Sequence, residues 1–161
     1  MSNEGPTYTR DILVKMNRYI RVNFTYQARD EEGTQSPVTT LELGTGSCRD
    51  FAVLMMEAAR RLGIATRFVS GYLYDPMLDS GASDGPATVG SGATHAWLNA
   101  YLPGAGWVPF DTTNNLLGGT LLIKVGVSRD ARQAVPISAS WNGASDAFRS
   151  LTVKVQVMRQ N

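Results

Sequence analysis

The sequence predicts one α+β domain in which N-terminal helices pack on an antiparallel β-sheet. Two segments, residues 7–24 and 47–62, place apolar side chains three and four positions apart, as amphipathic helices do. From residue 64 onward, β-branched and aromatic residues gather in short runs separated by glycine and proline, which is typical of strands. No internal repeat or linker divides the chain, so we expect residues 1–161 to form a single domain.

The first predicted helix, within residues 7–24, carries one apolar stripe. The stripe consists of Ile12, Met16, Tyr19, Ile20 and Phe24. Thr9 is the expected N-cap, because its hydroxyl can accept a hydrogen bond from a free backbone N–H of the first turn. Residues 25–37 are polar and contain Gly33 and Pro37, which predicts a loop, and residues 38–46 predict a short turn or helical piece.

The second predicted helix, from Ser47 to Leu62, is the clearest element of the sequence. Its apolar stripe consists of Cys48, Phe51, Ala52, Met55, Ala58, Ala59 and Leu62. Ser47 is the expected N-cap, and Gly63 is suited to end the helix. Cys48, the single cysteine of the chain, therefore falls at the first helical position.

The second half of the chain predicts a sheet interrupted by one long loop. Residues 64–75 predict a strand, and the small and turn-forming residues 76–93 predict a mobile loop that gates a cleft. Residues 94–104 and 106–111 predict the two strands of a hairpin. Three further strands are expected in the tail, at residues 119–128, 134–141 and 150–159.

Composition and charge exclude several classes of protein. The net charge of +1 offers no electrostatic basis for binding nucleic acid or a membrane surface. No apolar run approaches the length of a transmembrane helix, and the first ten residues lack the apolar core of a signal peptide. We therefore expect a cytoplasmic protein, although the chain could also be a segment of a longer, targeted protein.

Alternation along the hairpin brings polar and aromatic side chains to one face. Residues 95, 97, 99 and 101 share that face. The residues between them, 96, 98, 100 and 102, are apolar and lie on the opposite face. In the second strand Trp107, Pro109 and Asp111 share a face, so Asp111 can lie beside His95 across the hairpin. His95 is the single histidine of the chain, so a cysteine–histidine pair can consist only of Cys48 and His95.

Cys48, His95 and Asp111 suit nucleophilic catalysis by a thiolate. A helix N-terminus and a neighbouring imidazolium both favour the thiolate, and the free N–H groups of the first turn can stabilise an oxyanion. His95 would transfer the proton, and Asp111 would orient the imidazole. With one cysteine and one histidine, a zinc site of the cysteine–histidine type lacks ligands, so we expect neither a metal nor another cofactor.

Each of these residues also has a simpler structural interpretation. A cysteine on an apolar helix face commonly fills space in a core, and a single histidine in a strand is commonly structural. Asp111 precedes a run of turn-forming residues and could act as a cap. The combined placement of the three side chains favours catalysis over these separate structural roles.

The order Cys48, His95, Asp111, with gaps of 47 (48 to 95) and 16 (95 to 111) residues, resembles the transglutaminase-like superfamily within the papain-like cysteine proteinase fold. The segments "GSCRDFAVLMMEAARRLG", "THAWLNAYLPGAGWVPFDTTN" and "VGVSRDARQAVPISASWNG" are similar to bacterial members described as cysteine proteases, and the resemblance covers residues 8–158. It implies a nucleophilic Cys48, an acid–base His95 and an orienting Asp111. On the same basis, the residues expected near the substrate are Gln35, Ser47, Trp97 and Trp107.

The resemblance implies a thiol-dependent acyl-transfer enzyme that acts on a peptide or protein substrate. With water as acyl acceptor the enzyme is a cysteine protease or amidase, which is the favoured interpretation, and with an amine it is a cross-linking transglutaminase. A catalytically silent peptide-binding module is the alternative from another class. Such bacterial relatives often carry an additional N-terminal β-rich domain, so this chain could be the catalytic core alone. The substrate and the oligomeric state stay open.

Overall fold

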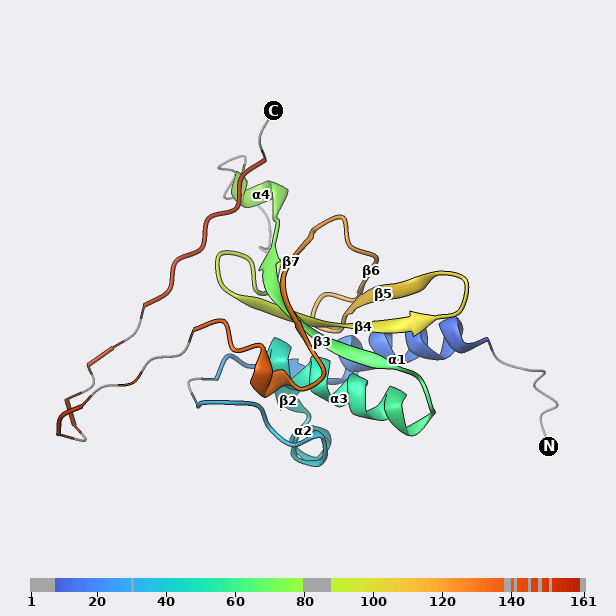
Figure 1. Cartoon of the computed structure of the whole chain (residues 1–161), viewed down its shortest axis with the longest axis horizontal. Helices are drawn as coiled ribbons and strands as arrows, with labels where there is room; N and C mark the ends of the chain where they lie inside the picture. Colours follow the sequence, from blue (N-terminus) through green and yellow to red (C-terminus); the bar gives the residue numbers. More distant parts are fainter. Residues whose placement is uncertain are drawn as a thin grey trace.

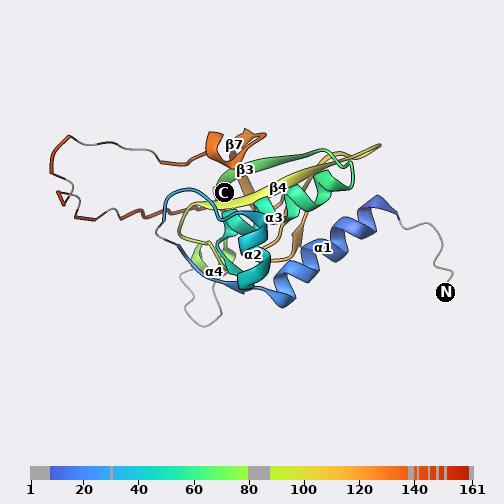
Figure 2. The ribbon, with the colours of Figure 1, turned by 90° about the horizontal axis from the view of Figure 1, so that it is seen from below.

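The computed structural model has the predicted α+β architecture. Helices pack on one face of a five-stranded antiparallel sheet (Figures 1 and 2). The structure describes residues 8–29, 31–79, 88–137, 140, 142–144, 146–147, 149–150 and 152–159. Figure 2 shows the three longer helices together on one side of the strands. The second face of the sheet therefore carries no helix of comparable length among the described residues.

Helix α1, Thr9–Asn23, forms where the sequence predicts it, and the predicted stripe is confirmed in part, because Ile20 is buried and Met16 and Phe24 pack against the core. Its buried residues are Leu13, Asn17 and Ile20, whereas Tyr19 of the predicted stripe is 60% exposed. Asn17 tolerates burial because its amide donates to Asn115 Oδ1 at 3.2 Å and to the Leu116 carbonyl at 3.4 Å. The buried face thus includes a polar residue, which a count of apolar positions does not detect.

The ends of α1 also correct the sequence prediction. Tyr8, with extended backbone, is the N-cap and makes no side-chain cap hydrogen bond, so the prediction of Thr9 as cap is wrong.

Helix α2, Pro37–Leu43, confirms the short helical piece. Ser36 caps it by accepting from Thr39 N at 3.0 Å, and Gly44 ends it in the left-handed conformation at φ 64°.

A two-stranded parallel pair, which the sequence analysis missed, joins β1 (Thr25–Tyr26) to β2 (Thr45–Gly46). The pairing ties the segment after α1 to the segment just before Ser47. Gly46 is needed at this point, because an added Cβ would lie 2.9 Å from the Cβ of Asp50 and 3.2 Å from the Phe51 ring. The segment that leads into the helix at Cys48 is therefore fixed by its pairing with β1 and by its close packing against Asp50 and Phe51.

Helix α3, Cys48–Arg61, begins after Ser47 as predicted and supplies the main contribution to the core. Five of the seven residues of the predicted stripe are buried, whereas Ala58 is half-buried and Leu62 is 59% exposed. Its apolar face packs against the sheet in one cluster. The principal members from the sheet are Phe68, Ala96, Leu98, Ala100 and Phe110.

The sheet has the strand order β6-β5-β4-β3-β7. Its strands are β3 (Thr66–Leu73), β4 (His95–Leu102), β5 (Gly106–Asp111), β6 (Leu116–Leu117) and β7 (Leu122–Ser128). The predicted hairpin is confirmed as β4 and β5, which pair from Leu98 with Phe110 to Leu102 with Gly106. The pairing of β3 with β7 shifts between Ser70 and Gly71, where one residue of β7 is left over.

The loop after β3 starts with a short helix, α4 (Pro76–Asp79). Residues 80–87, the middle of the segment predicted to be a mobile gating loop, lie outside the described part of the chain. Residues 88–93 form turns that lead into β4.

Two of the three strands expected in the tail are not formed in the described residues. Residues 119–128 supply β7, and a short 3-10 turn follows at Ala131–Gln133. Residues 134–137 and 152–159 contain no strand, because an alternating pattern becomes a strand only where a sheet edge is available in register. Instead, Val155 donates a single backbone hydrogen bond to the Gly92 carbonyl at 3.2 Å.

Candidate active site

Cys48 is the first residue of α3 and is 8% exposed. Ser47 precedes it with extended backbone, at φ −83° and ψ 174°, so the chain turns into the helix at the thiol. The first turn of a helix leaves backbone N–H groups without partners inside the helix, and its dipole favours negative charge. Cys48 also belongs to the apolar core cluster, which means that its thiol lies between the core and the helix N-terminus.

Asp50, which the sequence analysis did not single out, organises the start of α3. Its fully buried carboxylate accepts hydrogen bonds from Ser47 N and Ser47 Oγ, each at 2.8 Å, and from Gln35 N at 2.7 Å. The guanidinium of Arg29 lies 3.1 Å away and completes the ring of donors. Burial alone would raise the pKa of Asp50, but the hydrogen bonds from Ser47 and Gln35 outweigh it and hold this pKa below its usual value.

Gln35 and Ser47, both expected near the substrate, lie at the start of α3 and bond to Asp50. The side-chain amide of Gln35 donates to the Thr45 carbonyl at 3.2 Å and to Asp50 at 3.3 Å. Both hydrogens of this amide are therefore engaged, so the backbone N–H groups of α3 are better placed than Gln35 to bind an oxyanion. A serine followed three residues later by an acid is a capping pattern, and this signal could have identified Asp50.

His95 and Asp111 meet across the hairpin. His95 Nε2 lies 2.9 Å from Asp111 Oδ2, and both side chains are fully buried. The second oxygen of Asp111 accepts from Thr113 N at 2.9 Å, which fixes the orientation of the carboxylate. The register of β4 and β5 puts both residues on one face of the sheet.

The other ring nitrogen of His95, Nδ1, is buried and has no hydrogen-bond partner among the described residues. Burial alone would lower the pKa of His95, but Asp111 and the nearby thiol of Cys48 outweigh it and raise this pKa to about 10. The imidazole is therefore protonated at neutral pH. Nε2 is directed at a carboxylate, and the Cys48 thiol is close enough to the ring to contribute to the raised pKa of His95.

A second side chain that the sequence analysis missed, Asn114, joins Asp111 to the loop before β4. Its Nδ2 donates to Asp111 Oδ2 at 2.9 Å and to the Val89 carbonyl at 3.0 Å, while its Oδ1 accepts from Val89 N at 3.1 Å. Asp75 holds the same loop by accepting from Thr88 N at 2.9 Å. No signal in the sequence separates Asn114 from the turn-forming residues around it.

The loop held by Asn114 covers His95. Gly90 has φ +90°, and a Cβ added there would lie 2.4 Å from His95 Nδ1. Glycine therefore serves both the backbone conformation and the close approach to the imidazole.

The two tryptophans expected at the site have different positions. Trp97 is buried and stacks on His95, with ring centroids 6.1 Å apart and planes 30° from parallel. Trp107 lies at the opposite end of β4, where its ring meets Tyr101 at 5.4 Å and the guanidinium of Arg67 at 4.2 Å. The structure brings Trp97 to His95 but leaves Trp107 away from it.

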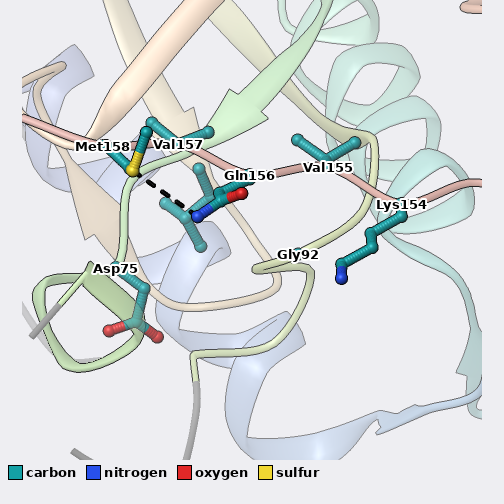
Figure 3. A pocket seen from close by; sticks show the side chains of 8 residues that line it. Asp75, Gly92, Lys154, Val155, Gln156, Val157 and Met158 are labelled. Atoms are coloured by element: carbon teal, nitrogen blue, oxygen red, sulfur yellow. Dashed lines mark hydrogen bonds between the residues drawn. The ribbon is translucent and has the colours of Figure 1, made fainter. Parts of the chain in front are cut away.

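The C-terminal segment borders the far side of the Gly92 loop. A cavity of about 350 Å³ lies there, lined by Leu73, Asp75, Gly92 and residues 154–158. Figure 3 shows the extended segment crossing this loop, with Gln156 bonded to the sulfur of Met158. This cavity contains neither Cys48 nor His95 in its lining.

Comparison with known proteins identifies the family. The protein-family model of the transglutaminase-like superfamily matches residues 2–112, a range that includes Cys48, His95 and Asp111. The chain belongs to the transglutaminase-like superfamily. An uncharacterised Mycobacterium leprae protein is 34% identical over 149 residues, which cover 91% of this chain and 50% of that protein. An uncharacterised Mycobacterium tuberculosis protein is 30% identical over 135 residues, which cover 79% and 40%.

Two solved structures from other bacteria have a similar fold. A Cytophaga hutchinsonii protein described as a putative cysteine protease superposes with a TM-score of 0.64 at 26% identity, over 80% of this chain and 39% of that one. Calcium-bound LapG of Legionella pneumophila superposes with a TM-score of 0.57 at 17% identity, over 88% and 76%, which shows the fold alone. The chain spans about half the length of the M. leprae relative.

Two further properties concern only the part of the chain that the structure describes. None of the helices there has the length and apolar character needed to cross a membrane. The histidine, cysteine and acidic side chains described there form no group of three or more that could hold a metal ion.

Proposed function

We propose that this domain is a thiol-dependent acyl-transfer enzyme that hydrolyses peptide or carboxamide bonds, with Cys48 as nucleophile, His95 as acid and base, and Asp111 as the orienting carboxylate. The observation that carries the proposal is the position of His95. Its Nε2 is held by Asp111 at 2.9 Å, and Cys48, at the N-terminus of α3, is close enough to contribute to the raised pKa of the ring. The Cytophaga hutchinsonii relative, described as a putative cysteine protease, supports this choice.

The proposed reactive form of the site pairs an imidazolium with a thiolate. The raised pKa of His95, about 10, keeps its ring protonated at neutral pH. Asp111 balances this buried positive charge and fixes the ring plane. A thiolate next to an imidazolium and a helix N-terminus is the reactive form of cysteine.

Acylation begins when the Cys48 sulfur attacks the substrate carbonyl carbon. A C–S bond forms, and the carbonyl electron pair moves to oxygen, where free N–H groups of the first turn of α3 stabilise the oxyanion. Collapse of the intermediate breaks the C–N bond, and the leaving amine takes its proton from His95. The product of this half-reaction is a thioester on Cys48.

Deacylation reverses the proton transfer. His95 takes a proton from water, the hydroxide attacks the thioester carbonyl, and the C–S bond breaks to release the carboxylic acid. Cys48 leaves as the thiolate and His95 is again protonated, so the site returns to its starting state. An amine in place of water would give a new amide bond, which is transglutaminase chemistry.

Alkylation with iodoacetamide between pH 5 and 9 tests the proposal, since Cys48 is the single cysteine of the chain. We expect rapid alkylation at pH 6 and a loss of about tenfold or more in that rate in His95→Ala, with Asp111→Asn between the two. Alkylation that accelerates only above pH 8 and is insensitive to His95→Ala would contradict the enzyme and favour a silent binding module. Mass spectrometry of a trapped thioester, with and without an added amine, then identifies the acyl acceptor.

A further inference from the structure

A cavity of about 240 Å³ lies on the helix-covered face of the sheet, and we call it the strand-end cavity. Its lining includes Ser70, Tyr72, Thr94, Gly126 and Ala134. Ser70 and Tyr72 follow Phe68 at intervals of two along β3, and Thr94 precedes Ala96 by two. Because side chains alternate along a strand, these residues share the face on which Phe68 and Ala96 pack against α3.

The strand-end cavity lies at the level of the helix N-terminus. Thr66 Oγ donates to the Met56 carbonyl at 3.3 Å, which sets the alignment of β3 with α3. From Met56 back to Cys48 the helix rises about 12 Å, which is the length of about three to four strand residues. The antiparallel course of β3 therefore brings Ser70 level with Cys48, and the sheet beyond it extends past the start of the helix.

Both walls of the strand-end cavity are anchored to the candidate catalytic residues. One wall contains Thr94, the residue before His95. The other contains Ala134, whose carbonyl accepts from Arg49 Nη1 at 3.5 Å, while Arg49 Nη2 donates to the Ala131 carbonyl at 3.0 Å. Arg49 follows Cys48 in the chain, so one wall of the cavity adjoins His95 directly and the other is joined to the start of α3 through Arg49.

We propose that the strand-end cavity binds one uncharged side chain of the peptide substrate next to the scissile bond, an inference that rests on the proposed function. The lining residues include hydroxyl, amide and apolar side chains but none that is charged. A charged substrate side chain would lose its hydration there without gaining a counterion. The volume is below the range of about 300–1,000 Å³ typical of sites for whole small ligands, so it suits a single side chain.

Gly126 offers a way to fill the cavity. A Cβ added there meets only the Ala134 Cβ, at 3.9 Å, and the backbone has no positive φ, so Gly126→Leu directs a larger side chain toward the Ala134 wall. Gly119→Leu is the matched control. It is the same substitution at another glycine without positive φ, and its added Cβ would lie 3.5 Å from Pro109 Cγ, outside the cavity.

The test uses dipeptidyl acyloxymethyl ketones that vary only the side chain of the ketone-bearing residue, which corresponds to the substrate side chain next to the scissile bond. The thiolate displaces the acyloxy group, so that a C–S bond forms as the C–O bond breaks and the carboxylate leaves with the electron pair. We expect Val, Leu and Thr probes to label Cys48 at least tenfold faster than Asp or Lys probes. Gly126→Leu should slow the uncharged probes about tenfold, and Gly119→Leu should leave them within twofold.

Iodoacetamide, which needs no side-chain pocket, separates failure of the subsite from failure of the enzyme. Its rate should stay within twofold in both variants, and circular dichroism checks their folding. Three outcomes would overturn the subsite alone, provided that iodoacetamide still reacts in a His95-dependent way. They are equal labelling by charged and uncharged probes, labelling that is unaffected by Gly126→Leu, and no labelling by any probe. Absence of His95-dependent alkylation would instead overturn the proposed function on which the subsite rests.

Discussion

The Asn114 amide donates to the Asp111 carboxylate at 2.9 Å, and the same side chain holds both the N–H and the carbonyl of Val89. One residue thus connects the proposed orienting acid with the loop that covers His95. The hydrogen bonds of this one side chain therefore link two parts of the site that are separated in the sequence.

Replacing Asn114 should loosen both partners. In Asn114→Ala we expect the alkylation rate of Cys48 at pH 6 to fall about tenfold, because Asp111 loses a donor, and we expect faster hydrogen exchange at the Val89 amide. Asn114→Asp is the matched variant, since it can still accept from Val89 N but places a second carboxylate beside Asp111. Unchanged alkylation in both variants would show that the contact is structural only.

Gly90 and Gly92 form a natural pair for testing the close approach of the loop to His95. Both have positive φ, at +90° and +75°, but only Gly90 would bring a Cβ against His95, because nothing lies within 4 Å of a Cβ at Gly92. We expect Gly90→Ala to reduce the alkylation rate at pH 6 by tenfold or more and Gly92→Ala to cost only the backbone strain of about 1 kcal/mol. Equal effects on alkylation in the two variants would contradict the steric argument.

His95 should make the stability of the domain dependent on pH. The pKa of about 10 in the folded state exceeds the usual value of 6.5, so the folded state binds the proton more tightly than the unfolded chain does. This contribution is fully present below pH 6.5 and is lost as the pH rises through about 10. Urea denaturation at intervals of pH should show the decline, and the His95→Gln variant should lack this component of it.

Asp50 should be critical for stability even though it is outside the proposed triad. Asp50→Asn leaves the partly buried Arg29 with only the exposed Glu31 carboxylate, 3.4 Å away, and we expect a loss near the lower end of about 3–5 kcal/mol in the free energy of unfolding. Asp130→Asn is the control, because the Asp130–Arg132 pair is exposed at the surface, where water screens the two charges, and its loss should change the free energy of unfolding little. A similar loss in the two variants would argue against the Asp50 network as the anchor of α3.

The local signals that were strong in the sequence identified elements and their order. The stripe from Cys48 to Ala59 predicted α3, with Ser47 before it, and the alternation after Thr94 predicted the hairpin that brings Asp111 to His95. The same alternation failed at residues 152–159, because no sheet edge takes them in register. Periodicity also missed part of the buried face of α1, where the amide of Asn17 donates to Asn115 and to the Leu116 carbonyl.

The sequence by itself determined the α+β class, the start of α3 at Cys48, and a face of the hairpin shared by His95 and Asp111, because periodicity and capping act over a few residues. Only the tertiary structure decided which polar side chains support Cys48, His95 and Asp111. Asp50 gains its donors from Arg29 and Gln35, and Asn114 gains its partners from the loop at Val89. These contacts join segments that are 15 to 25 residues apart in the chain, and their formation depends on how the chain packs rather than on any local pattern.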